Sequence, residues 1–230
     1  MIARTDGTMR SKTSIRCLFL DIGGVLLSDR WDRRARKRAA NKFRLDLPEM
    51  ERRHALKFEA FEEGKLTLEE YLRLVVFDEK RSFTQGQFRR FMFLQSKPLP
   101  EMTALVARLK ARYGLKIAAV SNESRELDGH RIRQFGLDRL VDCFISSCFV
   151  HTRKPDADMF RLALDIAQVP AGQVAYIENT PMFVQIAEGL GIRSILHTDY
   201  RTTRAKLASL GLRGDRGRDE LLSLASTRGA

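Results

Sequence analysis

Polar side chains stand directly after three short apolar runs of this sequence. Asp21, Ser121 and Glu178 each follow four consecutive apolar residues, and Lys154 precedes a proline in the segment 152–155. Two carboxylates, a hydroxyl and an ammonium group are what phosphoryl transfer through an enzyme carboxylate requires: a nucleophile, oxygen ligands for a cation, and donors to the phosphate oxygens. These residues therefore indicate phosphoryl transfer as the candidate chemistry, provided that the fold brings them together.

The two carboxylates are candidate ligands of a hard cation. Asp21 can act both as a nucleophile and as a ligand of Mg²⁺, which prefers oxygen donors. Glu178 supplies a second carboxylate, and Asn179 next to it a neutral side-chain oxygen. A plainer interpretation stays open for both acids, because Asp21 also suits a turn after a strand and Glu178 an ordinary polar turn.

The remaining polar groups are candidate phosphate ligands. Ser121 offers a hydroxyl and the turn at Asn122 a backbone N–H, while Lys154 offers a positive charge that Pro155 places before a helix. Ser121 is equally suited to cap the helix that follows it, and Lys154 to a surface position beside a proline.

The period of the apolar residues predicts the elements that position these groups. From Leu99 onward, short apolar runs alternate with helix-like segments, which is typical of a parallel sheet. Ligands bind outside the carboxyl ends of the strands in such a sheet. We therefore predict an α/β protein with a Rossmann-like, doubly wound parallel sheet, in which Asp21, Ser121 and Glu178 share one edge. The strands after the first are expected at 117–120, 142–146, 173–177 and 192–196.

Between the first strand and Leu99 the pattern is wholly helical. Thr67 with Glu70, and Thr84 with Gln87, form capping boxes at the start of two helices. This segment is predicted to be an inserted small α-helical cap with helices at 31–43, 48–63, 67–79 and 84–95. The predicted organisation is a flexible leader 1–13, a core made of 14–29 and 98–212, a cap 30–97 and a tail 213–230.

Four segments resemble the motifs of the haloacid dehalogenase superfamily, in the same order. They are Asp21-Ile22-Gly23-Gly24-Val25-Leu26, Ser121-Asn122, Lys154-Pro155-Asp156 and Tyr176-Ile177-Glu178-Asn179. Their spacing is similar to that of subfamily I, which carries a helical C1-type cap between the first two motifs. The resemblance implies a Mg²⁺-dependent phosphatase in which Asp21 attacks a small phosphorylated metabolite and forms an aspartyl-phosphate that water hydrolyses.

The resemblance also implies a role for each motif residue. Asp21 and Lys154 would be catalytic, and Ser121, Asn122 and Lys154 would hold the phosphate. The implied metal ligands are Asp21, the Gly23 carbonyl, Glu178 and Asn179.

Two positions depart from the phosphatase pattern. Gly23 stands where these enzymes usually have a second Asp, a general acid and base that is typically worth about 10²–10⁴ in rate. Asn179 stands where Asp is usual, so the metal site has one negative charge fewer. The alternatives are therefore a catalytically impaired pseudophosphatase or binding protein, and a metal-free haloacid dehalogenase. A metal-type carboxylate at Glu178 argues against the dehalogenase.

Composition bounds the partners. The formal net charge is +12, and seven basic residues lie between Arg30 and Lys42. That segment fits a solvated helix face or contact with an anionic substrate; nucleic acid is not expected, since no binding motif accompanies it, although the basic segment leaves it open. No apolar stretch is long enough to cross a bilayer, so no membrane partner is expected.

The remaining residue types give coarser expectations. Three cysteines without metal-type spacing suit a reducing compartment, and we expect a cytoplasmic monomer or homodimer. The four histidines, His54, His130, His151 and His197, show no ligand spacing and are expected to be structural or surface residues.

Overall fold

Five parallel strands form one sheet with the order β3-β2-β1-β4-β5 in the computed structural model, which describes residues 13–29 and 31–214. β1 lies in the centre, where Leu20 is in register with Ala119 of β2 and Ile177 of β4. The predicted Rossmann-like parallel sheet is confirmed. The strands are β1 Cys17–Leu20, β2 Lys116–Ser121, β3 Cys143–Ser146, β4 Val174–Glu178 and β5 Arg193–Leu196.

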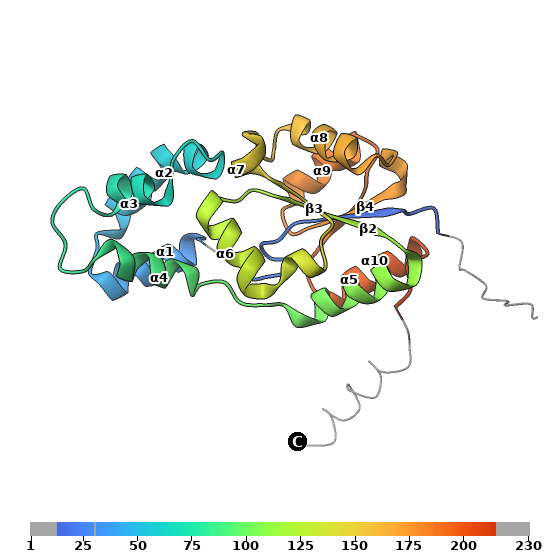
Figure 1. The fold of residues 1–230 in the computed structure, drawn as a ribbon, viewed down its shortest axis with the longest axis horizontal. Helices are drawn as coiled ribbons and strands as arrows, with labels where there is room; N and C mark the ends of the chain where they lie inside the picture. The colour runs from blue at the N-terminus through green and yellow to red at the C-terminus, as the bar shows by residue number, and fades with distance from the viewer. Residues whose placement is uncertain (1–12, 30, 215–230) are drawn as a thin grey trace, which may run out of the picture.

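Helices cover both faces of the sheet, which is why the strands read as unbroken apolar runs rather than as alternating ones. Leu18 and Leu20 of β1 face the layer of α5 and α10, while Cys17 and Phe19 face the layer of α8 and α9. Figure 1 shows the two helix layers on opposite sides of the strands. The helices are α5 Pro100–Tyr113, α8 Ala157–Ala167, α9 Pro181–Gly189 and α10 Tyr200–Ser209.

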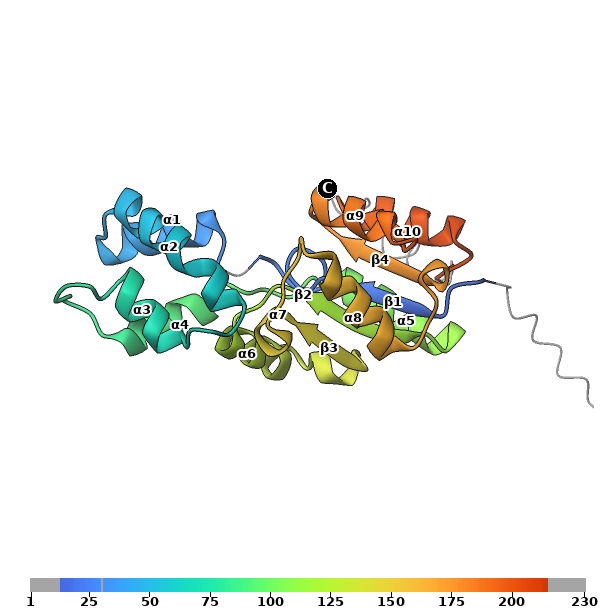
Figure 2. The same cartoon turned by 90° about the horizontal axis from the view of Figure 1, so that it is seen from above.

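Four helices between β1 and α5 pack together at one end of the molecule, beyond the carboxyl ends of the strands (Figures 1 and 2). They enclose an apolar cluster of their own that includes Trp31, Phe61, Tyr71 and Phe88. The helices are α1 Arg33–Phe43, α2 Leu47–Glu62, α3 Leu68–Val75 and α4 Gln85–Phe93. We call this group, residues 31–94, the cap.

Both predicted capping boxes are present, at Thr67 and at Thr84. The third cap helix, however, ends at Val75 and not near residue 79. The Arg81 side chain donates to the carbonyl of Val76 at 2.7 Å and pairs with Asp78, so side-chain contacts take over where helical hydrogen bonds would continue.

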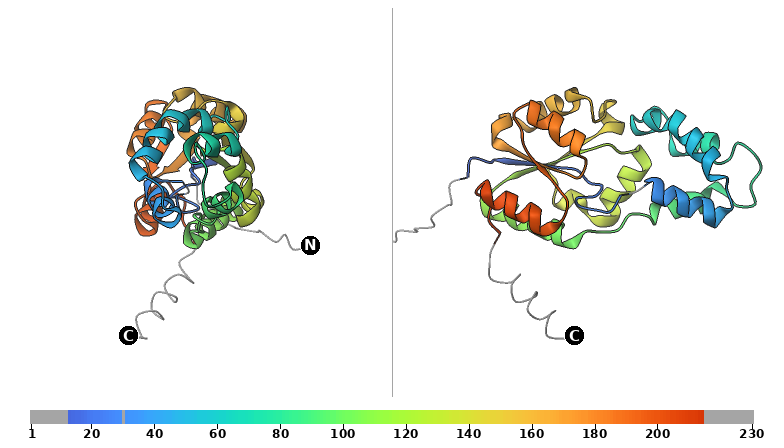
Figure 3. Two further views of the ribbon diagram at one scale, coloured as in Figure 1. Left: turned by 90° about the vertical axis from the view of Figure 1, so that its left-hand side faces the viewer. Right: turned by 180° about the vertical axis from the view of Figure 1, so that it is seen from behind.

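The two connections between cap and sheet run antiparallel beside each other. Ser28 N–H donates to the Lys97 carbonyl at 2.8 Å, and Leu27 forms a bridge with Pro98. Figure 3 shows the cap joined to the remainder of the chain at this place. The cap therefore hangs on a paired stem that begins six residues after Asp21.

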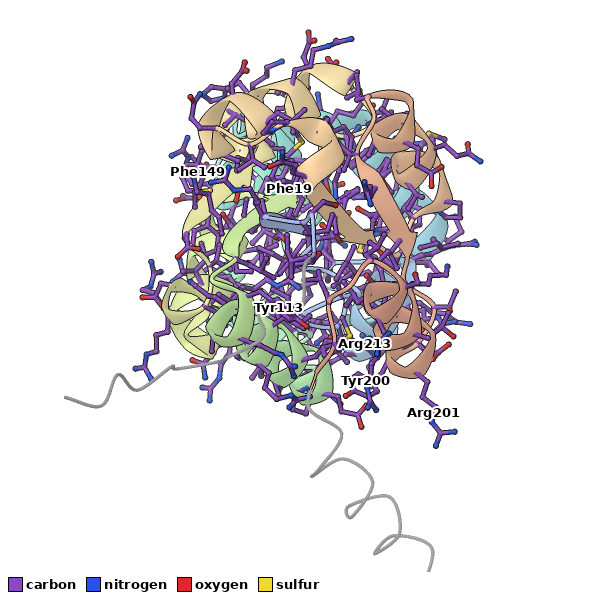
Figure 4. All side chains as sticks on the ribbon, turned by 90° about the vertical axis from the view of Figure 1, so that its right-hand side faces the viewer. Phe19, Tyr113, Phe149, Tyr200, Arg201 and Arg213 are labelled. Atoms are coloured by element: carbon purple, nitrogen blue, oxygen red, sulfur yellow. The ribbon has the colours of Figure 1, made fainter. Side chains whose placement is uncertain are left out.

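The sequence pattern also predicts a helix between Asn122 and Gly136, and α6 Arg125–Phe135 confirms it, with Gly136 as its C-cap. Two helices were not expected: the short α7 Ser147–Val150 follows β3 directly, and α10 lies in a segment without a clear apolar period. Beyond α10, Arg213 N–H donates to the Tyr113 hydroxyl at 2.9 Å, which ties the chain back to α5 (Figure 4).

Most of the predicted leader and tail, residues 1–12 and 215–230, lie outside the described residues. None of the helices in the described part of the chain has the length and apolar character that a membrane crossing requires.

Candidate active site

The structure places three of the predicted residues at the same edge of the sheet. Asp21 follows β1 directly, and its N–H donates to the Ile177 carbonyl of β4 at 3.0 Å. Ser121 is the last residue of β2 and Glu178 the last residue of β4, the two neighbours of β1. Lys154 reaches this edge from the loop between α7 and α8.

The Lys154 ammonium group connects the two carboxylates. Its Nζ lies 3.0 Å from Asp21 Oδ1 and 2.6 Å from Glu178 Oε2, and it also donates to the Tyr176 hydroxyl at 3.1 Å. Lys154 is 1% exposed. Among the described residues, no group donates to the other oxygen of Asp21, Oδ2. The carboxylate of Asp21 is thus held through one oxygen and leaves the other for chemistry.

The charges of this cluster support one another. Burial alone lowers the pKa of Lys154, but the carboxylates of Asp21 and Glu178 outweigh it, so its pKa is raised and the ammonium form persists. Burial and then the negative charge of Asp21 raise the pKa of Glu178, against the opposing effect of Lys154. Burial raises the pKa of Tyr176 well above its ordinary value, which keeps its hydroxyl protonated.

Tyr176 is a site residue that the sequence reasoning missed. Its hydroxyl donates to Glu178 Oε2 at 2.5 Å, the same oxygen that Lys154 contacts. The signal was available, because residues 176 and 178 are two apart on one strand and therefore point to the same face. A second set of bonds fixes Glu178, whose Oε1 accepts the Thr180 N–H at 2.9 Å.

Asn122 contacts the site through its side chain. Its Oδ1 accepts the backbone N–H of Lys154 and its Nδ2 donates to the backbone carbonyl of Lys154, both at 2.8 Å. The Asn122 side chain thus fixes the loop that carries the Lys154 ammonium group. The sequence pattern does not predict this role. Ser121 Oγ lies 3.4 Å from Glu123 Oε1 and is buried at the end of its strand.

A buried ion pair lies beside the loop after β1. Arg131 Nη1 contacts Glu123 Oε1 at 2.5 Å, and Arg131 Nη2 donates to the Ser28 carbonyl at 3.0 Å. Both side chains are fully buried. No local pattern in the sequence predicts this pair, because it joins the residue after the β2 turn to the middle of α6.

The turn after Asp21 is built from two glycines with different surroundings. Gly24 has φ +75°, and a Cβ at this position would overlap the amide of Asn179, which packs against it. Around Gly23 a Cβ would meet only ordinary contacts, namely Asp29 Oδ1 at 3.6 Å, Asp21 Oδ2 at 3.8 Å and Arg131 Nη1 at 3.9 Å.

The donor set at this edge fits Mg²⁺. Two carboxylates, Asp21 and Glu178, converge on one point that a cationic group already occupies, the Lys154 ammonium. Mg²⁺ is commonly bound by one or two carboxylates together with water and substrate phosphate, so a cluster of three acidic ligands is not required. Within residues 13–29 and 31–214 no such larger cluster of histidine, cysteine or acidic residues is present.

A cavity of about 210 Å³ lies between the cap, Asp29 and the start of α6, and the cluster of Asp21, Ser121, Lys154 and Glu178 does not line it. Trp31 Nε1–H donates to the Tyr71 hydroxyl at 2.8 Å, and this hydroxyl lies 2.8 Å from His54 Nδ1. Burial and then the nearby Arg36 lower the pKa of His54 to about 4, so the ring is neutral at pH 7. The lining residues are Asp29, Trp31, Asp32, Arg36, His54, Phe58, Phe61, Glu62, Ser124 and Leu127. His54, expected only to be structural or on the surface, therefore lines the cavity.

The basic segment of the cap is divided. Arg36 is buried, pairs with Glu51 through two contacts of 2.9 Å, and donates to the Trp31 carbonyl at 2.6 Å. Arg33, Arg34, Lys37 and Arg38 are exposed. The solvated helix face is the better interpretation for these four, whereas Arg36 is part of the cap structure.

Comparisons with known proteins agree with this fold. A family model described as hydrolase, haloacid dehalogenase-like hydrolase, matches residues 15–211. The enzyme BT-2542 of Bacteroides thetaiotaomicron, solved as a magnesium complex, superposes with a TM-score of 0.67 at 17% identity, covering 91% of this chain and 98% of that one. A predicted HAD-like family hydrolase of Porphyromonas gingivalis gives a TM-score of 0.64 at 19% identity, covering 94% and 99%.

One sequence relative covers part of the chain. The protein PpaX of Caldanaerobacter subterraneus subsp. tengcongensis, which is named for a pyrophosphatase activity, is 27% identical over 95 residues. The match covers 41% of this chain and 43% of that relative.

Proposed function

The chain belongs to the haloacid dehalogenase-like hydrolase family, and from this premise we propose that it is a Mg²⁺-dependent phosphomonoesterase acting on a small phosphorylated metabolite. The observation that carries the proposal is the arrangement of Asp21. One carboxylate oxygen is held by the buried Lys154, while Oδ2 accepts no hydrogen bond from the described residues and lies in a side chain that stays 12% exposed. That oxygen is the nucleophile.

The reaction proceeds in two displacements at phosphorus. Asp21 Oδ2 attacks the phosphoryl group, the bond to the leaving-group oxygen breaks, and an aspartyl-phosphate forms. Water then attacks the same phosphorus, which releases inorganic phosphate and restores the Asp21 carboxylate. Lys154, the Ser121 hydroxyl and the Asn122 N–H stabilise the negative charge on the phosphate oxygens.

A cation completes the charge balance. When bound, Mg²⁺ supplies positive charge that offsets the crowded carboxylate and phosphate oxygens. Asp21, the Gly23 carbonyl, Glu178 and Asn179 would hold it. Support comes from the solved relative BT-2542, which has been crystallised with magnesium and with magnesium plus inorganic phosphate.

The cap chooses the substrate in this proposal. The cavity between the cap and the start of α6 accommodates the leaving group, and the cap excludes water while the phosphoryl group is transferred. A small metabolite fits a space of about 210 Å³ better than a polymer does. We propose that the protein works without nucleic acid or a membrane, as a monomer or homodimer in the reducing cytoplasm, where its three free cysteines persist.

The test is phosphate release from a panel of phosphomonoesters. Wild-type protein should release phosphate only with Mg²⁺, and Asp21→Asn should lose the activity while remaining folded. Asp158→Asn is a matched control, since Asp158 only pairs with Arg161 on the surface and its substitution should leave the rate unchanged. Equal rates for wild type and Asp21→Asn would refute the proposal.

A metal-free haloacid dehalogenase is the second candidate, favoured by one observation. Both oxygens of Glu178 already accept hydrogen bonds, from Lys154 and Tyr176 on one side and from Thr180 on the other, so this carboxylate is held in place without a metal. Halide release from a 2-haloacid in the presence of EDTA would establish it. Tight phosphate binding without turnover at high Mg²⁺ would indicate a pseudophosphatase instead.

A further inference from the structure

The space beside Gly23, where a phosphatase of this family carries a second carboxylate, is bordered by another one. Asp29 Oδ1 lies 3.6 Å and Asp21 Oδ2 3.8 Å from the position that a Cβ of residue 23 would occupy. The Asp21 oxygen that we propose as the nucleophile and the Asp29 carboxylate therefore both lie within 4 Å of the same point. Asp29 stands eight positions after Asp21 in the chain and does not belong to the motif of residues 21–26.

The turn after β1 explains why Asp29 returns to this place. Gly24 N–H donates to the Leu27 carbonyl at 2.6 Å, and residue 27 forms a bridge with residue 23. Ser28 is then fixed on two sides, because its carbonyl accepts from the buried Arg131 and its N–H donates to Lys97. The backbone before Asp29 is thus held by the core and by the stem of the cap.

Asp29 also reaches the space assigned to the leaving group. It lines the cavity between the cap and the start of α6, together with Ser124 and Trp31. It is exposed to solvent, so the water that attacks in the second displacement can reach its carboxyl group. A proton-transfer group has to lie near the reacting groups and to be accessible to water, and the position of Asp29 meets both requirements.

We propose that Asp29 is the general acid and base of this enzyme, in place of the carboxylate that Gly23 lacks; the inference rests on the proposed phosphatase function. In the first step, the Asp29 carboxylic acid donates its proton to the leaving oxygen as its bond to phosphorus breaks, and an alcohol departs. In the second step, the Asp29 carboxylate accepts a proton from the water whose oxygen bonds to phosphorus. The Asp21–phosphorus bond breaks, which yields inorganic phosphate and regenerates both residues.

The leaving group separates this role from a structural one. Asp29→Asn should lower kcat about 10²–10³-fold with an alkyl phosphate, whose alkoxide needs a proton to depart. With p-nitrophenyl phosphate, whose leaving group departs without one, the same variant should release one nitrophenolate per active site in a rapid burst and then slow down, because water attack on the aspartyl-phosphate still lacks its base.

Two further variants complete the experiment. Asp46→Asn removes the same charge from the exposed N-cap of α2, a position at which asparagine also caps a helix. This variant should behave as wild type with both substrates. Gly23→Asp in the Asp29→Asn background should recover at least 10-fold of the lost rate and abolish the burst, since a Cβ at residue 23 meets only ordinary contacts.

The outcomes distinguish this inference from the function beneath it. Wild-type activity together with an unchanged Asp29→Asn variant overturns the role of Asp29 and leaves the phosphatase proposal standing. A rate loss that is equal for the two substrates and shows no burst also overturns it, because it marks a structural effect. If the wild type releases no phosphate from any ester, both proposals fail.

Discussion

The edge of the sheet and the cap are stabilised in opposite ways. At the edge, the ion pairs of Lys154 with Asp21 and Glu178 are buried at the ends of parallel strands. In the cap, aromatic rings provide the core, and a tyrosine and a neutral histidine share the polar contacts behind the cavity. Charge is concentrated at the edge that we propose to be catalytic, and aromatic packing in the cap that we propose to select the substrate.

Side-chain contacts attach the cap to the rest of the chain near α7. Arg153 pairs with Glu62 of α2 at 3.0 Å and lies over the Phe58 ring, and Ser147 Oγ donates to the Glu62 carbonyl at 2.7 Å. Apolar and stacking contacts join the cap to α6 as well, because Leu127 packs into the aromatic cluster of the cap and Phe93 stacks on His130. The cap is thus joined to the rest of the chain both by polar contacts and by apolar packing.

Removing the buried ammonium group at the edge of the sheet should have the largest effect on the free energy of unfolding. Lys154→Met leaves the buried carboxylates of Asp21 and Glu178 without their cation, and breaking a buried pair in this way typically costs about 3–5 kcal/mol. The free energy of unfolding from urea titration should fall by this amount. Lys110→Met is the control, since Lys110 pairs with Asp142 at the surface and its loss should cost less than about 1 kcal/mol. Equal losses would remove the distinction between a buried and a surface pair.

The stability of the cap should decrease as the pH falls, because His54 is neutral in the folded protein. The pKa of His54 is about 6.5 in the unfolded chain and about 4 in the folded protein. Between these two values the unfolded state binds more protons than the folded state. The free energy of unfolding therefore decreases as the pH is lowered through this range. The loss begins below about pH 6.5, is complete near pH 4, and amounts to about 3 kcal/mol. His54→Gln keeps an acceptor for the Tyr71 hydroxyl but cannot bind this proton. Between pH 7 and pH 4 its free energy of unfolding should therefore fall by about 3 kcal/mol less than that of the wild type. Parallel stability curves for the two proteins would contradict this account.

A smaller effect should follow from loosening the attachment of the cap. Gly64 has φ +70°, and a Cβ there would overlap the backbone of Cys148 in α7. Gly64→Ala should therefore cost about 2 kcal/mol, of which the left-handed backbone accounts for roughly 1–2 kcal/mol. KM should rise more than kcat falls. Gly172→Ala, where no atom lies within 4 Å, should stay within about 0.5 kcal/mol of wild type; a similar loss there would show that the cap contact is not the cause.

The catalytic edge could largely be predicted from the sequence, because a parallel sheet converts local patterns into shared positions. Asp21, Ser121 and Glu178 each end an apolar run, and the ends of parallel strands meet. Tyr176 could have been added from its two-residue spacing to Glu178. The ion pair between Glu123 and Arg131 could not, since nothing in either segment encodes its partner.

The cavity was not predictable in the same way. Asp29, His54 and Ser124 line it from a stem, a cap helix and the start of α6, and no sequence period relates them. Asp29 approaches Gly23 only because the turn after β1 folds back on itself. The side-chain role of Asn122 likewise depends on where the loop of Lys154 comes to rest, which is decided by tertiary packing and not by propensity.

The most direct test of the central claim is to look for phosphate on Asp21 during turnover. Protein quenched in acid while it hydrolyses a phosphomonoester with Mg²⁺ should yield one peptide heavier by a phosphoryl group, and fragmentation should place that group on Asp21. The Asp29→Asn variant, in which water attack is slow, should show the larger fraction of modified peptide. Continued phosphate release with an unmodified Asp21 in both proteins would contradict the account.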